Sequence, residues 1–258
     1  MIKKKTNRFR QKAANLLHRI AERMRFDANF PFGNPNIELL RYHRDFMFSH
    51  KFETVLDIGA NIGQSAKKYR ALFPNAMIYS FEPLPDCYAQ METAMVGDSR
   101  FRAFEMALGD ESGTRTFYRS SFAQSSSFLL MADLHKRVAP YSAGSEPCTV
   151  RIERLDDLAD QLELRPNMLV KIDVQGFEDA VLRGGEKTIR MAQMLILEVS
   201  FSELYHGQVL FADLVKMLDT WGFKILNLRP AGRDHVTKSM LWADCAFVAV
   251  GTSGAARS

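Results

Sequence analysis

VLDIGANIG (residues 55–63) starts as an apolar run and ends in a tight turn through two glycines. The run predicts a buried β-strand, and the turn predicts the start of a helix. Asp57 lies at the end of the predicted strand. Gly59 and Gly63 let the backbone come close to a ligand at the carboxyl edge of a sheet, beside a helix N-terminus. The stretch therefore predicts the ligand-binding corner of a doubly wound α/β sheet.

The rest of the sequence continues this alternation of short apolar runs and helical stretches. Such a rhythm is typical of βα units around a parallel sheet. We therefore expect an α/β, Rossmann-like fold: a seven-stranded, mostly parallel sheet with an antiparallel last strand and helices on both faces. The expected strands and helices are residues 54–58, 64–73, 77–81, 86–96, 101–106, 115–119, 148–154, 169–174, 178–183, 194–199, 209–221, 223–228 and 241–250.

Three shorter segments have their own expected roles. The Ser-rich stretch 120–127 interrupts the rhythm, and we expect it to be a surface connection, with a mobile lid as the alternative. Residues 229–239 are expected to form a loop before the last strand. Leu214, Leu218, Trp221 and Phe223 recur at core spacing and predict a packing cluster, not a substrate site.

The first 50 residues predict a helical extension ahead of a domain that spans residues 51–258. Residues 1–25 hold nine Lys or Arg and one Glu, whereas the net charge of the whole chain is +4, so the basic excess lies entirely at the N-terminus. A basic amphipathic helix is expected over residues 1–26. Its apolar face either packs on the domain, which we favour, or contacts an anionic membrane or polymer. The face consists of Phe9, Ala13, Leu16, Leu17, Ile20 and Met24.

Composition narrows the class of protein. Hydrophobic residues make up 47% and charged residues 25% of the 258 residues, the balance of an ordinary globular protein. Cys87, Cys148 and Cys245 have no paired spacing, which indicates neither a disulfide framework nor a cysteine-ligated zinc site. The chain has no apolar run typical of a secretory signal or a membrane span. A cytoplasmic location is expected, with peripheral membrane contact as an option.

The carboxylate of Asp57 favours one kind of cofactor over another. A dinucleotide would place its pyrophosphate at this turn and normally uses three glycines, whereas only Gly59 and Gly63 are present. A phosphate-binding P-loop is excluded because no Gly-Lys-Ser/Thr follows the turn. S-adenosylmethionine carries an ammonium, a sulfonium and no phosphate, so a carboxylate at the end of the strand favours it.

The ends of the next two strands predict contacts with an adenosine. Glu82, followed by Pro83, ends the second strand, and a carboxylate there can accept hydrogen bonds from both ribose hydroxyls. Nicotinamide enzymes use an acid in the same way, so Glu82 supports adenosine binding without selecting the cofactor. Met106 and Ala107 end the third strand and are expected to form a wall around the adenine.

Six motifs occur along the chain in a fixed order: DxGANxG (57–63), FEP (81–83), ALGD (107–110), KIDVQGFE (171–178), VLRG (181–184) and LEV (197–199). In this order they resemble the motifs of FkbM-type methyltransferases. The resemblance spans residues 55–250 and implies a class I methyltransferase fold with methyl transfer from S-adenosylmethionine, usually to oxygen. Family members often have Glu where this sequence has Gln175, so no essential charge is assigned there. The cofactor-binding residues so expected are Asp57, Gly59, Ala60, Asn61, Gly63, Glu82, Pro83, Met106, Ala107 and Asp173.

Three residues are candidates for a catalytic base. A hydroxyl acceptor must lose a proton, and a base within hydrogen-bond reach assists that loss. Asp173, at the end of the fourth βα strand, is the first candidate, and Glu198, at the end of the next strand, is the second. His206, in the loop that follows, is the third. Binding of the methionyl ammonium, orientation of the acceptor and joint binding of a divalent metal stay open for the two acids, although no ligand cluster with recognisable spacing predicts a metal.

The sequence thus predicts O-methylation of a hydroxyl on a sugar, glycan, lipid or secondary metabolite, an acceptor range that the family resemblance implies. The alternatives are a non-catalytic binding protein that keeps the fold and an NAD-dependent oxidoreductase. A nucleic-acid methyltransferase stays open because of the basic helix, but no nucleic-acid partner is expected, since the sequence has no Asn/Asp-Pro-Pro-aromatic motif of base-amino methyltransferases.

Overall fold

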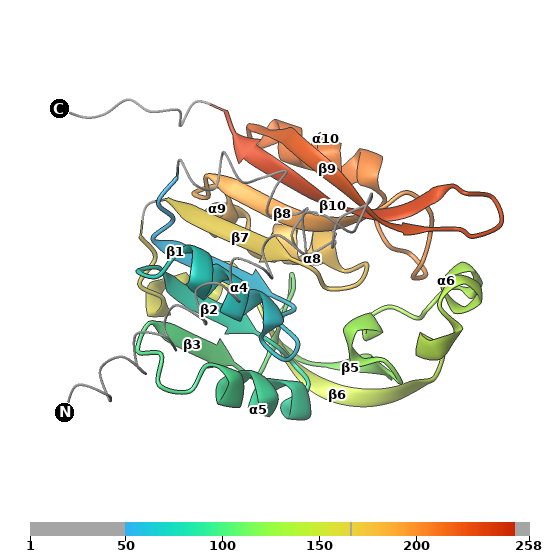
Figure 1. The fold of residues 1–258 in the computed structure, drawn as a ribbon, viewed down its shortest axis with the longest axis horizontal. Coiled ribbons are helices and arrows are strands. Elements are labelled where there is room, and N and C mark those ends of the chain that lie inside the picture. The colour runs from blue at the N-terminus through green and yellow to red at the C-terminus, as the bar shows by residue number, and fades with distance from the viewer. Residues whose placement is uncertain (1–49, 166, 251–258) are drawn as a thin grey trace, which may run out of the picture. The chain divides into compact units, whose positions relative to one another are not determined.

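A seven-stranded sheet in the order β3-β2-β1-β7-β8-β10-β9 forms the centre of the domain (Figure 1). The computed structural model describes residues 50–165 and 167–250. Strand β10 pairs antiparallel with both of its neighbours, whereas the other pairs are parallel, which confirms the predicted sheet. The strands are β1 (Thr54–Ile58), β2 (Met77–Phe81), β3 (Phe101–Phe104), β7 (Met168–Ile172), β8 (Met194–Ser200), β9 (Phe223–Arg233) and β10 (Met240–Ala249).

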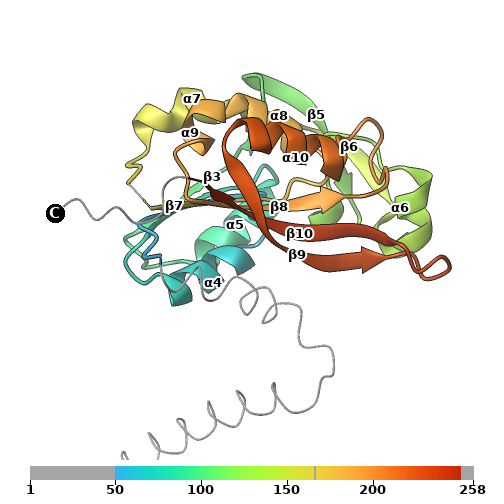
Figure 2. The same cartoon turned by 90° about the horizontal axis from the view of Figure 1, so that it is seen from above.

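Helices cover both faces of this sheet, as expected (Figure 2). Side chains of α7, α8, α9 and α10 pack with Leu56 and Ile58 of β1 in one core cluster. Helix α4 packs with Val55 of the same strand in a second cluster on the opposite face. Because both faces are covered, all five residues of β1 are buried. The helices are α4 (Gln64–Leu72), α5 (Pro85–Ala94), α7 (Leu155–Leu158), α8 (Glu178–Gly184), α9 (Glu186–Ile189) and α10 (Phe211–Thr220).

A second sheet, of order β4-β6-β5, extends from the chain after β3. The Ser-rich stretch 120–127, which the sequence predicts to be a surface connection, is only partly on the surface. Ser121, Phe122 and Gln124 are exposed, whereas Ser125, Ser126 and Ser127 are at most 9% exposed because this end of the stretch folds inward. The hydroxyl of Ser127 donates a hydrogen bond to the carbonyl oxygen of Gln175 (2.7 Å). The elements of this part are β4 (Ala107–Leu108), β5 (Gly113–Ser120), η1 (Ala123–Ser125), α6 (Asp133–Val138), η2 (Pro140–Ser142) and β6 (Ser145–Glu153).

The end of the chain also differs from expectation. Strand β9 continues to Arg233, through the first part of the expected loop 229–239, and the connection to β10 is residues 234–239. Register shifts in the β9–β10 pair accommodate Pro230 and Gly232 within the strand. The ring of Trp242 packs against Gly232, where an added Cβ would lie 2.2 Å from the ring. The strand extension therefore gives Trp242 its position.

The expected packing cluster, the cysteines and the N-terminal extension can each be compared with the structure. Leu214, Leu218 and Phe223 belong to the main core, and Trp221 packs against it, which confirms the predicted packing cluster. The three cysteines are free thiols. Within the described ranges no helix is both long and apolar enough to cross a bilayer. The expected basic helix over residues 1–26 lies outside the described residues, as does the extension over residues 1–50 except for His50.

The turn between β1 and α4 lies directly against the end of β7. Gly59 has a φ of +76°, and a Cβ at this position would lie 1.9 Å from the backbone oxygen of Asp173. Only glycine satisfies both the left-handed conformation and the close approach of the two backbones. Gly59 therefore sets the distance between the two chain segments that carry the predicted site.

Replacement of Gly59 by Ala tests this constraint against a matched glycine. Gly97 has a similar φ of +83°, but no atom lies within 4 Å of its added Cβ. The left-handed conformation should cost each Ala variant about 1–2 kcal/mol of unfolding free energy. Gly59→Ala should lose about 1–3 kcal/mol more because the neighbouring backbone must move. Chemical denaturation measures both losses, and equal losses would contradict a close backbone approach at Gly59.

Candidate active site

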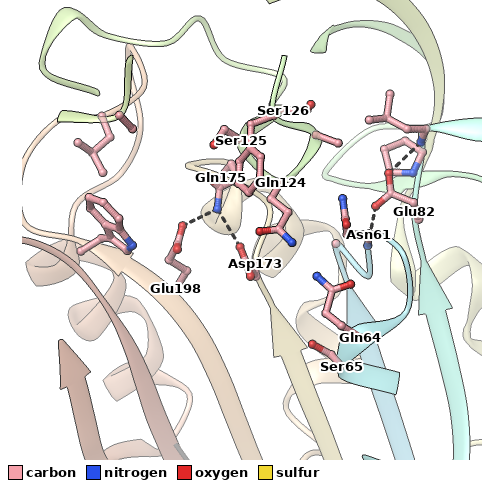
Figure 3. A pocket seen from close by; sticks show the side chains of 18 of the residues that line it. Asn61, Gln64, Ser65, Glu82, Gln124, Ser125, Ser126, Asp173, Gln175 and Glu198 are labelled. Atoms are coloured by element: carbon pink, nitrogen blue, oxygen red, sulfur yellow. Dashed lines mark hydrogen bonds between the residues drawn. The ribbon is translucent and has the colours of Figure 1, made fainter. Parts of the chain in front are cut away.

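A cavity of about 290 Å³ opens where β1, β2, β7 and β8 end, which is where doubly wound sheets bind ligands (Figure 3). Its lining comes from several parts of the chain. The segments after β1 and β2 contribute Gly59, Asn61, Gln64, Ser65, Glu82, Pro83 and Leu84. Strands β7 and β8 and the segments that follow them contribute Lys171, Asp173, Gln175, Glu198 and Leu204. The segment from β5 to η2 contributes Phe117, Phe122, Ala123, Gln124, Ser125, Ser126, His135, Ala139 and Tyr141, and β10 contributes Trp242.

Glu82 connects the two turns at one end of the cavity. Its carboxyl oxygens accept hydrogen bonds from the backbone N–H groups of Asn61 (2.8 Å) and Leu84 (3.0 Å). Burial raises the pKa of Glu82 to about 7, and the two backbone hydrogen bonds oppose part of that rise. Since each carboxylate oxygen has a second lone pair, Glu82 can also accept from two hydroxyl groups of a ligand.

Asp57 lies beneath the cavity and not in its lining. Its side chain is fully buried, and the ammonium of Lys171 lies 3.4 Å from its Oδ1 atom. Burial raises the pKa of Asp57, and Lys171 opposes part of that rise. In this structure the carboxylate pairs with Lys171, and the expected direct or water-mediated attraction of a cationic cofactor to Asp57 stays a prediction.

Lys171, the first residue of the KIDVQGFE motif, is a buried cation to which the motif assigned no role. Its Nζ donates a hydrogen bond to the backbone oxygen of Gly59 (2.9 Å) and lies 3.5 Å from Oδ2 of Asp173. Burial lowers the pKa of Lys171, but Asp173 and Asp57 more than reverse this, so the pKa is raised above its ordinary value. Lys171 thus neutralises part of the acidic charge at the strand ends. A lysine inside the otherwise apolar run 168–172 was the signal in the sequence.

The two expected acids at the ends of β7 and β8 are joined by one side chain. The Nε2 atom of Gln175 donates hydrogen bonds to Oδ1 of Asp173 (2.9 Å) and Oε2 of Glu198 (2.7 Å), as Figure 3 shows. Burial raises the pKa of Glu198 well above its ordinary value, and Asp173 and Glu178 raise it further. The side chain of Asp173 is 37% exposed, so it is open to a molecule in the cavity.

Tyr205 and His135 support the opposite side of the cavity. The Tyr205 hydroxyl lies 2.9 Å from Oε1 of Gln175 and 3.0 Å from the carbonyl oxygen of Ser125. His135 packs edge-on against the Tyr205 ring, with 5.0 Å between centroids, and its Nε2 lies 3.3 Å from Oγ of Ser142. Burial lowers the pKa of His135, which therefore stays neutral near pH 7. No local motif marks His135 in the sequence, because the fold alone brings it to the cavity.

His206 does not lie with Asp173 and Glu198. Its side chain is 58% exposed, and its ring lies 4.0 Å from the Glu203 carboxylate. The inward side of this turn is occupied by Tyr205, which is 2% exposed. A catalytic role for His206 stays a prediction, and the geometry gives it no contact with the cavity lining.

The remaining expected cofactor residues fall into two groups. Gly59, Asn61, Glu82, Pro83 and Asp173 line the cavity. Ala60 and Gly63 shape the turn beneath it. Met106 and Ala107 are buried in core clusters because the chain leaves the main sheet at Phe104, and residues 107–108 pair with β6 instead. Their expected contact with an adenine stays a prediction.

Metal chemistry was left open for the two acids. Among the described residues, no group of three or more His, Cys, Asp and Glu side chains is arranged to hold a metal ion. The donors nearest to Asp173 and Glu198 are instead the amide of Gln175 and the ammonium of Lys171. The acids therefore form part of a protein network of hydrogen bonds and charges.

Comparisons with known proteins found chains that are similar to this one. The chain is 29% identical to the 2-O-methyltransferase NoeI of Sinorhizobium fredii (strain NBRC 101917 / NGR234) over 201 residues, which cover 75% of this chain and 82% of that protein. It is 26% identical to Methyltransferase 1 of Beauveria bassiana (strain ARSEF 2860), over 68% of this chain and 74% of that protein. The magnesium protoporphyrin IX methyltransferase of Synechocystis PCC 6803 is similar in structure, with a TM-score of 0.47, 11% identity and coverage of 83% and 77%.

A family model gives the assignment. The model of the methyltransferase FkbM domain matches residues 57–225, which run from the end of β1 into β9 and include both acids and the Gln175 bridge. This match covers more than half of the chain. The chain therefore belongs to the FkbM methyltransferase domain family.

Proposed function

We propose that this protein transfers the methyl group of S-adenosylmethionine to a hydroxyl oxygen of a small-molecule or glycan acceptor. The observation that carries the proposal is a single cavity with Glu82 at one end and the Asp173–Gln175–Glu198 bridge beside it. Membership of the FkbM family and the likeness to a 2-O-methyltransferase support the same reaction.

The residues around Glu82 fit a nucleoside. The Glu82 carboxylate is oriented by two backbone donors and can still accept from the vicinal hydroxyls of a ribose. The backbone at Gly59 lines the cavity without a side chain that would block it. When bound, S-adenosylmethionine supplies a methyl group on a sulfonium, and the sulfur leaves as a neutral thioether.

The two acids fit the proton that a hydroxyl acceptor must lose. As the acceptor oxygen bonds to the methyl carbon, the sulfur–methyl bond breaks, its electron pair stays on sulfur and the hydroxyl proton moves to a carboxylate. Asp173 is the better candidate for the base, because its side chain is 37% exposed, whereas the raised pKa of Glu198 leaves a smaller fraction of that group ionised and able to accept a proton. Holding the donor and acceptor in line supplies most of the acceleration, since the leaving group is already good.

The part of the lining that comes from η1 and α6 fits a neutral, hydroxyl-rich acceptor. Its polar groups are uncharged: Gln124, Ser125, Ser126 and His135, whose pKa is lowered by burial. The aromatic side chains of Tyr141 and Trp242 offer flat surfaces to the apolar side of a sugar ring. An acceptor with its own negative charge would meet Asp173 and Glu198, which disfavours phosphorylated acceptors.

Two measurements test the proposed function. Calorimetry with S-adenosylhomocysteine and with NAD should give binding of the first and none of the second. Incubation of the protein with methyl-labelled S-adenosylmethionine and fractionated cell extract should label a product whose methyl group is bound to oxygen, as mass spectrometry of the product determines. Binding of NAD alone, or a methyl group on nitrogen or carbon, would contradict the proposal.

The titration of Glu82 predicts how cofactor affinity depends on pH. Only the ionised carboxylate accepts from both ribose hydroxyls, and the pKa of Glu82 is about 7. The affinity for S-adenosylhomocysteine should therefore rise roughly tenfold between about pH 6 and 8, as the carboxylate ionises. Glu82→Gln should weaken binding by roughly tenfold or more at pH 8 and abolish this rise. The exposed Glu163→Gln is the control and should keep both. A Glu82→Gln variant with the same pH dependence as wild type would rule out this role.

Single-turnover methylation ranks the three candidate bases. Asp173→Asn should lower the rate by roughly 100-fold, because general-base assistance contributes about 10²–10⁴-fold. Glu198→Gln should have a smaller effect, and His206→Ala should leave the rate unchanged. Rates are measured with labelled S-adenosylmethionine and the extract fraction that the wild-type protein labels. A wild-type rate for Asp173→Asn together with a large loss for His206→Ala would contradict the assignment.

A further inference from the structure

Gln175 uses every polar atom of its side chain within the cavity wall. Both hydrogens of its Nε2 group are donated, one to Asp173 and one to Glu198. Its Oε1 accepts from the hydroxyl of Tyr205. In Figure 3 the amide lies between the two carboxylates, directly above the ends of their strands.

The backbone that carries this amide is held by contacts that do not involve the Gln175 side chain. Gln175 has a φ of +58°, and its carbonyl oxygen accepts from the hydroxyl of Ser127. The following turn is fixed by Glu178, whose Oε1 accepts from the N–H groups of Val174 (3.1 Å) and Gly176 (3.2 Å). These contacts survive any substitution of the Gln175 side chain, so its polar contacts can be removed separately.

The amide differs chemically from a carboxylate at this position because it donates hydrogen bonds and carries no charge. One NH₂ group can donate a hydrogen bond to each of two carboxyl groups, and each bond stabilises the ionised form of the group that accepts it. A glutamate at this position would add a third carboxyl group with nothing to donate unless it were protonated. The sequence thus contains a neutral donor at the one position where two acids meet.

We propose that Gln175 is a positioning residue for methyl transfer. Its amide holds the carboxylates of Asp173 and Glu198 side by side, and Asp173 can then take the acceptor proton at a lower pH than it could beside a glutamate at position 175. The kinetic part of this inference rests on the proposed function, whereas the bridge between the two acids does not.

The charged groups around Asp173 and Glu198 determine how strongly a carboxylate at position 175 would affect their protonation. Lys171 is the cation beside Asp173, and it also faces Asp57. Glu178 from α8 and Asp244 from β10 both act on Glu198, and Arg229 from β9 pairs with Asp244. Tyr205 contacts the amide from the other side. Negative groups outnumber cations here among the described residues, so a further carboxylate at position 175 would be poorly compensated.

Gln175→Glu and Gln175→Met separate the charge from the hydrogen bonds. For Gln175→Glu, the acid limb of the single-turnover rate should move up by about one pH unit or more, because a third carboxylate stabilises protonated neighbours. Gln175→Met, with similar length and no polar group, should lower the maximal rate by about tenfold or more while the affinity for S-adenosylhomocysteine is retained. Gln90→Glu adds the same charge on the exposed surface of α5 and should change neither the rate nor its pH profile.

A second readout needs no acceptor. In protein labelled with ¹³C at glutamate carboxyl groups, the Glu198 resonance is assigned by its loss in Glu198→Gln and followed through a pH titration. Its midpoint should rise in both Gln175 variants, since the ionised form loses a donor. Retained binding of S-adenosylhomocysteine shows that the variants are folded.

The two readouts distinguish failure of the inference from failure of the proposed function. An unchanged Glu198 midpoint in both folded variants would overturn the bridge. Shifted midpoints with a wild-type rate and pH profile would overturn the positioning role. Absence of methylation by the wild-type protein would instead contradict the proposed function, and the titration would still test the bridge.

Discussion

The buried ammonium of Lys171 connects the two strand ends on which the site depends. It donates to the backbone of the β1 turn at Gly59 and lies between the carboxylates of Asp57 and Asp173. Lys171 is the cation that acts most strongly on the fully buried Asp57, and burial of a charge without such a partner is strongly destabilising. The close contact between Gly59 and the Asp173 backbone needs the same alignment of β1 and β7. Lys171 therefore makes an acidic site compatible with a packed parallel sheet.

From this alignment the cavity acquires two chemically different halves. Glu82 and the turn after β1 form a polar corner suited to the hydroxyls of a nucleoside. The inward-folded segment after β5, with Tyr141 and Trp242, provides an uncharged and aromatic wall for an acceptor. Gln175 contacts both acids and, through Tyr205, the acceptor side. A methyl group passing from one half to the other would cross the cavity beside Asp173.

Local pattern in the sequence was sufficient to predict the sheet and to place Glu82 at the cavity, because strand ends and glycine turns follow from short-range periodicity. It was insufficient where distant segments meet. Asp57 was expected to face the ligand, but its neutralisation by Lys171 depends on the pairing of β1 with β7. His135 and Trp242 reach the cavity only through the second sheet and the β9–β10 pair, and Met106 turns into the core because the chain leaves the main sheet. Each depends on tertiary packing that no short motif encodes.

A crystal structure with S-adenosylhomocysteine tests the central claim most directly, since the orientation of the bound molecule decides which half of the cavity holds the donor. Both ribose hydroxyls should lie within hydrogen-bond distance of the Glu82 carboxylate, with the sulfur facing Asp173. A molecule bound outside this cavity, or one whose ribose lies against Tyr141 and Trp242 instead, would contradict the account.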